Sequence, residues 1–241
     1  MALNEHRDTV GIERPEPRRL TVGDRIIQSA MASRLVTLGY YVATDLELPG
    51  GYDEFADVAG MRPLLKEVKK RYRLGPAPVG ILHLLDRQEW TVTESIVDAA
   101  QASTDFIRGA LLEAETKGWV EKRIVQEDVV AWRINDYSLP GRDVFLVRCG
   151  SSDVAASMEA LKKMSRCCNQ TLLMLDYEVD GETMDECVQN GIGLSVYVPR
   201  MGYTREILSP EYRDISDIGG AMSIAERLLF ENYILRREDS I

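Results

Sequence analysis

The sequence predicts an α/β fold, in which a mixed sheet is interrupted once by a smaller helical module. Strand-like runs alternate with amphipathic helices over residues 21–74 and again over 139–241. The segment between them, 75–138, has a complete pattern of its own, with three short helices followed by a hairpin. A length of 241 residues, of which 45% are hydrophobic, suits one large or two small domains.

Composition and charge argue against several classes of protein. The formal net charge is -10, so indiscriminate nucleic-acid binding is not expected, although a local basic patch is compatible with it. No apolar run approaches the roughly 20 residues that cross a bilayer, and the start MALNEHRDTV is charged where a signal peptide is apolar. With 4 cysteines and 2 histidines, neither a disulfide scaffold nor a structural zinc is expected. We therefore expect a cytoplasmic protein without cofactor or membrane contact.

The first elements are an arm, a helix and a hairpin. Residues 1–20 mix basic, acidic and proline residues with few apolar ones, which predicts a flexible arm. Apolar residues then recur at helical spacing over 21–38, with Thr21 as N-cap and Gly39 as the stop. Strand formers over 40–48 and 55–59 flank a Pro-Gly-Gly turn, which predicts a hairpin.

The second half alternates between strand and helix. Strands are predicted over 144–147, 171–175 and 192–198, and helices over 153–166 and 181–189. A final helix is predicted over 215–237, with Asp217 in its first turn. Five of its residues are expected to offer an apolar surface to a homodimer or another protein partner: Ile224, Leu228, Leu229, Tyr233 and Leu235.

The central segment resembles a known DNA-binding module. Ser103 is placed to cap its third helix and Gly118 to end it, and the run Lys117-Gly118-Trp119-Val120 leads into a charged hairpin over 119–134. Three short helices and a hairpin in this order resemble a winged-helix domain. The resemblance implies that the third helix would be the one that enters the DNA major groove.

The flanking core is similar to the restriction-endonuclease-like core of the PD-(D/E)XK nuclease superfamily, with its hairpin, strand, helix and strand in the same order. The resemblance places Asp57 at the motif's metal-binding Asp. It also places Arg148 where the family has an acid and Gly150 where it has a Lys. Such nucleases hold Mg²⁺ through carboxylates, and a guanidinium would repel the ion. The resemblance therefore implies a degenerate catalytic motif without a metal site, unless Asp143, Asp153, Asp45 or Glu47 supplies a migrated carboxylate.

Two groups of residues are candidates for a DNA interface. Residues 62–73 carry six cations and one acid, and helical spacing directs Leu64, Leu65, Val68 and Tyr72 inward. Residues 75–137 carry six basic and eleven acidic residues, so their cations would have to gather on one face. The candidate contacts are Lys66, Lys69, Lys70, Arg73, Thr104, Arg108, Lys122, Arg123 and Arg133.

The expected function is therefore that of a non-catalytic binder of double-stranded DNA, in transcriptional regulation or genome maintenance. Two alternatives stay open. Both folds could bind proteins, which the acidic charge favours, or a migrated site could retain Mg²⁺-dependent nuclease activity. Architecture alone does not choose among them, because function resides in the site.

Overall fold

The computed structural model describes residues 20–49, 52, 54–72, 74, 76–82, 84–85, 89–126, 129–135, 138–150, 153–177 and 179–234. The predicted arm over 1–20 lies outside these residues except for Leu20. Two sheets are present in the described part, one of six strands and one of three. No helix in these ranges is long and apolar enough to span a membrane.

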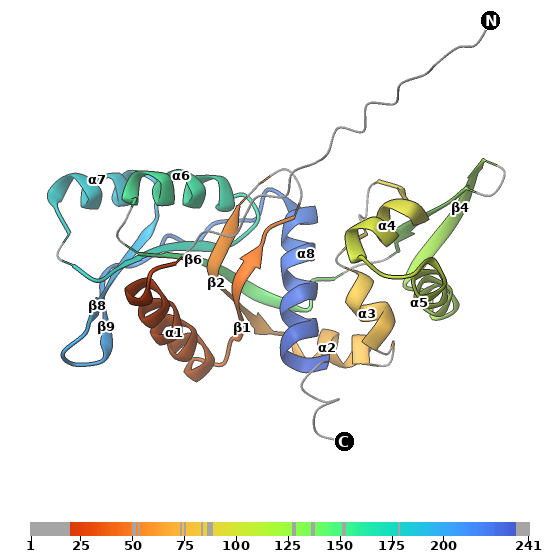
Figure 1. Ribbon diagram of the computed structural model, residues 1–241, viewed down its shortest axis with the longest axis horizontal. Coiled ribbons are helices and arrows are strands. Elements are labelled where there is room, and N and C mark those ends of the chain that lie inside the picture. Colours follow the sequence, from red (N-terminus) through yellow and green to blue (C-terminus); the bar gives the residue numbers. More distant parts are fainter. Residues whose placement is uncertain are drawn as a thin grey trace, which may run out of the picture.

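The six-stranded sheet has the order β1-β2-β6-β7-β8-β9 (Figure 1). The pairs β1-β2, β2-β6 and β8-β9 are antiparallel, whereas β6-β7 and β7-β8 are parallel. The sheet is therefore mixed, as the sequence predicts. Its strands are β1 (Tyr41–Glu47), β2 (Phe55–Pro63), β6 (Gly141–Cys149), β7 (Gln170–Leu175), β8 (Gly193–Val198) and β9 (Tyr203–Leu208).

Helices cover both faces of this sheet. On one face, Ile27, Met31 and Leu35 of α1 pack on residues of β2, β6 and β7. On the other face, α6, α7 and α8 close a larger cluster that draws on buried residues of β1, β2, β6, β7 and β8. The helices are α1 (Val22–Thr37), α6 (Val154–Met164), α7 (Gly181–Gln189) and α8 (Ile218–Leu229), and α8 continues as one π-helical turn over Phe230–Ile234.

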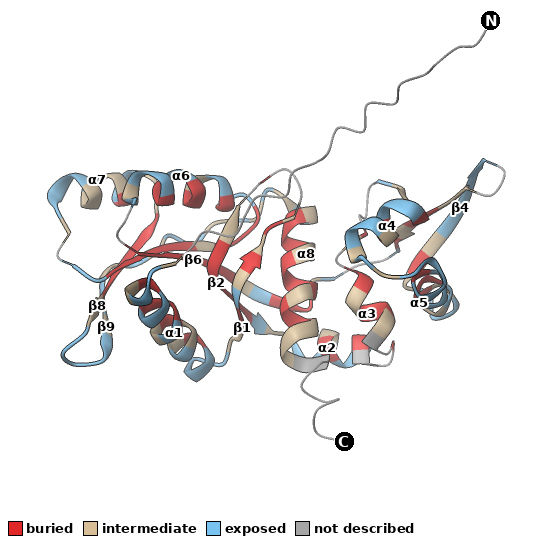
Figure 2. Cartoon of the chain, in the orientation of Figure 1, coloured by how far each residue is buried: buried red, intermediate tan, exposed pale blue. Residues whose placement is uncertain are grey.

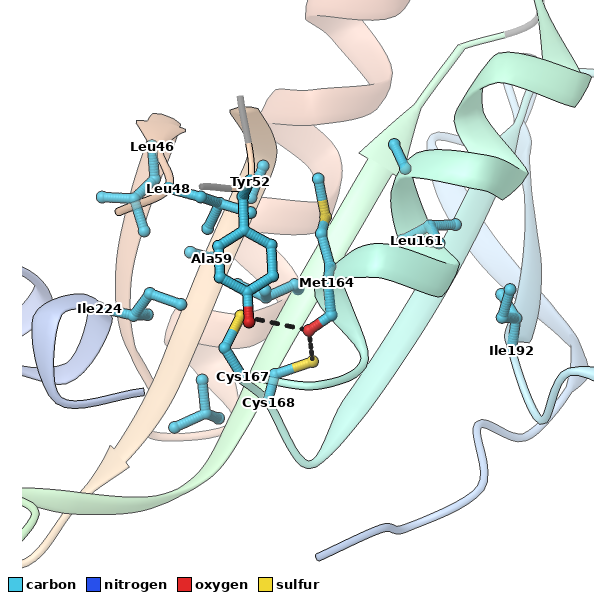
Figure 3. Packing of buried hydrophobic residues seen from close by; sticks show 14 of the residues in the cluster. Leu46, Leu48, Tyr52, Ala59, Leu161, Met164, Cys167, Cys168, Ile192 and Ile224 are labelled. Atoms are coloured by element: carbon cyan, nitrogen blue, oxygen red, sulfur yellow. Dashed lines mark hydrogen bonds between the residues drawn. The ribbon is translucent and has the colours of Figure 1, made fainter. Parts of the chain in front are cut away.

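The larger cluster contains a polar contact that ties the hairpin to α8. The Tyr52 hydroxyl donates to Oδ2 of Asp217 at 2.5 Å, and Asp217 also accepts from the Gly220 amide at the start of α8. Close by, the thiols of Cys167 and Cys168 both donate to the Met164 carbonyl (Figure 3). Both thiols are buried, as is common for free cysteines.

The central segment forms helices around the three-stranded sheet, whose order is β3-β5-β4 with both pairs antiparallel. Predicted caps are confirmed: the Ser103 hydroxyl accepts from the Phe106 amide, and Gly118 has a φ of 76°. Helix α2 (Leu65–Tyr72) precedes this segment, whose elements in chain order are α3 (Pro76–Leu82), β3 (Thr91–Val92), α4 (Thr93–Ala100), α5 (Thr104–Thr116), β4 (Val120–Gln126) and β5 (Val129–Ile134).

One buried side chain connects this segment to the core. Arg71 of α2 is fully buried, and its Nε lies 2.6 Å from Oε1 of Glu226 on α8, which is also fully buried. Its Nη2 donates to the Ser138 carbonyl at 2.6 Å, and its guanidinium lies 5.1 Å from the Trp119 ring centroid. Met222 and Leu229 of α8 also belong to the apolar cluster of the central segment. The segment therefore shares a packed boundary with the core.

The structure corrects the sequence analysis at several elements. Strands β3 and β9 have no counterpart among the predicted elements. Helix α2 begins at Leu65, because residues 62 and 63 still belong to β2, and Leu64 and Leu65 are exposed. The final helix offers no apolar surface at Ile224, Leu228 or Leu229, since these residues pack into the two clusters (Figure 2). The side chains of Tyr233 and Leu235 lie outside the described part.

Candidate functional site

Helix α5 has one buried and one exposed face. Ile107, Ala110, Leu111 and Ala114 recur at helical spacing and are buried in the cluster of the central segment. The opposite face is open to solvent and carries Thr104 and Arg108, as the sequence predicts. It also carries the carboxylate of Asp105 and the aromatic ring of Phe106, which is 51% exposed.

Helix α2 presents a short basic strip. Lys66 and Lys69 are exposed, and neither forms an ion pair with a described residue. Lys70 is bound by Glu67 at 2.8 Å, one turn away. The chain after α2 reaches the C-terminal end of α5, because Lys117, the C-cap of α5, donates from Nζ to the Leu74 carbonyl at 3.2 Å. Arg73 lies outside the described residues.

The two strands that follow α5 contribute cations that are largely compensated. Lys122 of β4 lies 3.0 Å from a carboxylate oxygen of Glu115. Arg133 of β5 binds the Glu121 carboxylate through two nitrogens, and its guanidinium lies 4.7 Å from the Trp90 ring centroid. Of the predicted cations in this hairpin, Arg123 alone is exposed without an ion pair to the described residues.

The structure thus divides the predicted contacts into two sets. Three cations are compensated by neighbouring acids: Lys70, Lys122 and Arg133. Four keep their charge available at the surface: Lys66, Lys69, Arg108 and Arg123. Exposed ion pairs cost little free energy to break. The acids beside the first set therefore lower the local positive potential, but they do not prevent these cations from contacting DNA.

Sequence reasoning missed an apolar component of this surface. Phe106 and Leu112 on α5, together with Ile124 and Val125 on β4, are large apolar side chains that face solvent. The signal was present for Leu112, which does not share the helical spacing of Ile107, Ala110 and Ala114. Phe106 lies four residues before Ala110, so the spacing alone did not mark it as exposed. Large apolar groups at a surface are typical of contacts with macromolecules or base methyl groups.

The second candidate region lies where β2 and β6 meet. Asp57, Arg148 and Gly150, the positions to which the resemblance assigned the motif, lie on or next to these strands, and Val58 of β2 stands opposite Val147 of β6. Oδ2 of Asp57 accepts from the Cys149 amide at 2.6 Å and lies 3.9 Å from Nε of Arg148. Arg148 also donates from Nη1 to the Phe55 carbonyl at 2.5 Å, and both side chains are buried.

Gly150 is needed at its position for two reasons. Its φ of 108° is in the left-handed region that glycine favours. A Cβ there would overlap the carboxylate of Asp24, which also accepts from the Thr21 amide in the capping box that begins α1. The position therefore contributes close packing and no chemistry.

Three of the carboxylates that could supply a migrated site are occupied or distant. Asp45 is held by Arg25 at 2.6 Å and by Gln28 at 2.9 Å. Asp153 caps α6 through the Ala156 amide. Asp143 pairs with Arg62. Asp143 lies six residues before Cys149 on β6, which places it roughly 20 Å from Cys149 along the strand.

These surroundings do not fit a divalent metal ion. A magnesium site needs several oxygen ligands, whereas Asp57 has a backbone amide and a guanidinium as its neighbours. Across the described residues, no three His, Cys, Asp or Glu side chains are placed to hold a metal together. We derive no metal-dependent step from this region.

Comparison of the chain with family models, with curated proteins and with solved structures finds no match in any of the three.

Proposed function

We propose that this protein binds double-stranded DNA without cleaving it, with α5 in the major groove and α2 beside the phosphate backbone. The observation that carries the proposal is the exposed face of α5, which carries Arg108. This helix belongs to the same segment as the small three-stranded sheet. The order α3, β3, α4, α5, β4, β5 also agrees with the resemblance to a winged helix.

The four available cations suit a division of roles. Lys66 and Lys69 are exposed on α2, and Leu74, two residues after that helix, contacts Lys117 at the end of α5; we assign these two lysines to phosphate contacts. Arg123 extends from the hairpin after α5. Arg108 lies on the helix itself, where a guanidinium can bind the O6 and N7 atoms of guanine.

The proposal of a non-cleaving protein is supported by the region around Asp57. The position that resembles the motif's acid holds Arg148, whose guanidinium faces Asp57 and would repel a cation. Gly150 has no side chain to activate a nucleophile.

The test is a titration of fluorescent duplex DNA at several salt concentrations, with a parallel Mg²⁺ reaction to detect cleavage. The double variant Lys66→Glu with Lys69→Glu should weaken binding to all sequences. It should also flatten the dependence of log K on log salt by about 0.9 for each phosphate that the variant no longer neutralises. Lys162→Glu with Lys163→Glu on α6 makes the same change of charge far from α5 and should leave binding unaltered.

Arg108→Ala separates the roles of α5 and α2. We expect it to relax preference at one base position by about 1–3 kcal/mol, with little change in the salt dependence. Equal losses on every sequence from both variants would reject the division. Cleavage that depends on Mg²⁺ and on Asp57 would reject the non-catalytic assignment.

A second candidate function is protein binding by the same surface, which the exposed Phe106, Leu112 and Ile124 favour. It predicts no DNA binding even at low salt.

A further inference from the structure

The outer face of α1 carries an apolar seam that no described residue covers. The inner face of this helix, with Ile27, Met31 and Leu35, packs under the sheet. On the outer face, five exposed residues follow one another at steps of four, three, four and three: Val22, Ile26, Ser29, Ser33 and Val36. Their exposure is high at the apolar positions, with 81% for Val22, 50% for Ile26 and 51% for Val36.

This spacing is the one at which two helices pack along a common seam. A soluble protein rarely leaves several large apolar groups in a row on one exposed helix face, unless another surface covers them. The seam has large residues at its ends and two serines in its middle, so the pattern of sizes reads similarly in both directions.

We infer that the seam binds a second copy of this chain, with the two α1 helices antiparallel about a twofold axis near Ser29. In this arrangement Val22 meets Val36 of the second copy, and Ile26 meets Ser33 of the second copy. Each large side chain at the inner positions therefore faces a small one. A surface that matches itself in this way is typical of a twofold interface between identical chains.

The surface beside the seam has room for the partner's side chains. Two open depressions, of about 560 and 440 Å³, flank α1, and both are lined by Ser29 and Ser33. One extends toward Thr44 of β1 and the other toward Tyr197 of β8. Side chains at Ile26 of each copy can enter the depression beside Ser33 of the other.

Charges at the two ends of α1 are balanced in this orientation. Near its start, Arg25 pairs with Asp45 at 2.6 Å; near its end, Arg34 lies 3.5 Å from Glu206. An antiparallel pairing places the first pair at the same end of the interface as the second pair of the other copy. Each end of the interface then holds two cations and two anions, without an excess of either sign. Antiparallel helix dipoles are favourable as well.

The expected dimer is a weak one. A helix of 16 residues is about 24 Å long, so contact along α1 lies at the small end of specific interfaces. The dimer should therefore dissociate on dilution. The inference does not depend on DNA binding, because α1 lies on the core and not in the central segment.

The first experiment measures molar mass by light scattering and by sedimentation over a wide range of concentration. The full chain should approach twice its mass of 27.1 kDa at high concentration. Ile26→Glu should remain at the monomer mass with an unchanged melting temperature, since the side chain is half exposed. Val188→Glu on α7, also at an exposed apolar residue, is the matched control and should dimerise like the wild type.

The second experiment uses Ser29→Cys, which places two thiols near the proposed axis. The four native cysteines are buried and should not compete. Mild oxidation should give a covalent dimer from Ser29→Cys but not from Thr116→Cys, which lies at the exposed end of α5.

Three results would overturn the inference. These are a wild-type chain that stays monomeric at all concentrations, a dimer that survives Ile26→Glu, or equal cross-linking of the two cysteine variants. A chain lacking residues 1–19 provides one more arm of the test. Dimerisation by this truncated chain alone would show that residues 1–19 cover the seam instead.

Discussion

Two buried arginines, Arg71 and Arg148, differ in how many of their nitrogens have hydrogen-bond partners. Arg71, at the boundary with the central segment, has a carboxylate at 2.6 Å, two backbone carbonyls and an aromatic ring around its guanidinium. Arg148, between β2 and β6, has one carbonyl at 2.5 Å and a carboxylate at 3.9 Å. Its Nε is buried without a hydrogen-bond partner.

The difference indicates what each site is built to do. A buried guanidinium is costly unless its hydrogen bonds are met, and those of Arg71 join α2, α8 and Ser138, which lies between β5 and β6. Arg71 therefore fixes how the central segment sits on the core. Arg148 is incompletely satisfied, so it contributes less to holding its neighbours together than Arg71 does.

The largest expected effect comes from removing one partner of the Arg71 pair. Arg71→Met or Glu226→Leu should each lower the free energy of unfolding by about 3–5 kcal/mol, because the remaining charge stays buried. The double variant should recover a large part of this loss. Denaturant titrations of all four proteins measure it, and a double variant as unstable as the sum of the singles would refute the coupling.

A smaller effect is expected from Gly150→Ala, beside Arg148. The left-handed backbone and the overlap with Asp24 should together cost about 2–3 kcal/mol. Gly202→Ala, at a φ of 64° with open space around it, is the matched control and should cost about 1 kcal/mol. Equal losses of stability in the two variants would mean that the Asp24 side chain moves aside at no cost in free energy.

Arg148→Met should cost less than Arg71→Met, about 1–2 kcal/mol. The variant gives up one good hydrogen bond and a distant ion pair, and Asp57 keeps its bond from the Cys149 amide. The same denaturant titration compares the two arginines directly. A loss for Arg148→Met that equals or exceeds that of Arg71→Met would overturn the ranking.

The smallest expected effect is a pH dependence of stability that comes from the buried thiols and not from the two arginines. Burial raises the pKa of Cys167 from 9.0 to about 12 and that of Cys187 to about 11. Each thiol is protonated in the folded chain at pH values where the unfolded chain has lost the proton. The stability that the protonated thiols contribute is thus fully present below pH 9 and falls as the pH rises toward 11–12.

Guanidinium groups do not titrate in this range. The slope of stability against pH, from denaturant titrations at several alkaline pH values, should therefore be the same in Arg71→Met, Arg148→Met and the wild type. A slope that changes in one arginine variant would reveal an unexpected link between that region and the thiols.

Local signals predicted most elements well. The caps at Thr21 and Ser103, the stop at Gly118 and the helix over 181–189 follow from interactions within a few residues, and the structure confirms them. The signals failed where tertiary contacts dominate. Strand β3 has two residues and exists through its pairing with β5, and the apolar stripe of α8 reads the same whether it faces solvent or a core.

In the candidate DNA interface, too, some features follow from the sequence and others from tertiary contacts. Which residues carry positive charge over 62–73 and 75–138 is a property of the sequence, and so is the excess of acids in the second range. Tertiary contacts decided which of these cations form ion pairs, since Lys122 on β4 pairs with Glu115 on α5. Arg71, assigned to a basic helix from its sequence, is instead fully buried.

The sequence by itself determined the alternation of strands and helices, the position of the central segment and the residue types at Asp57, Arg148 and Gly150, because these depend on local periodicity and chemical identity. The tertiary structure alone decided that Arg71 joins two parts of the molecule, that α8 is enclosed and that the outer face of α1 is open. The physical reason is that a helix carries the same hydrophobic pattern in either environment, and only long-range packing determines which of its faces another element covers.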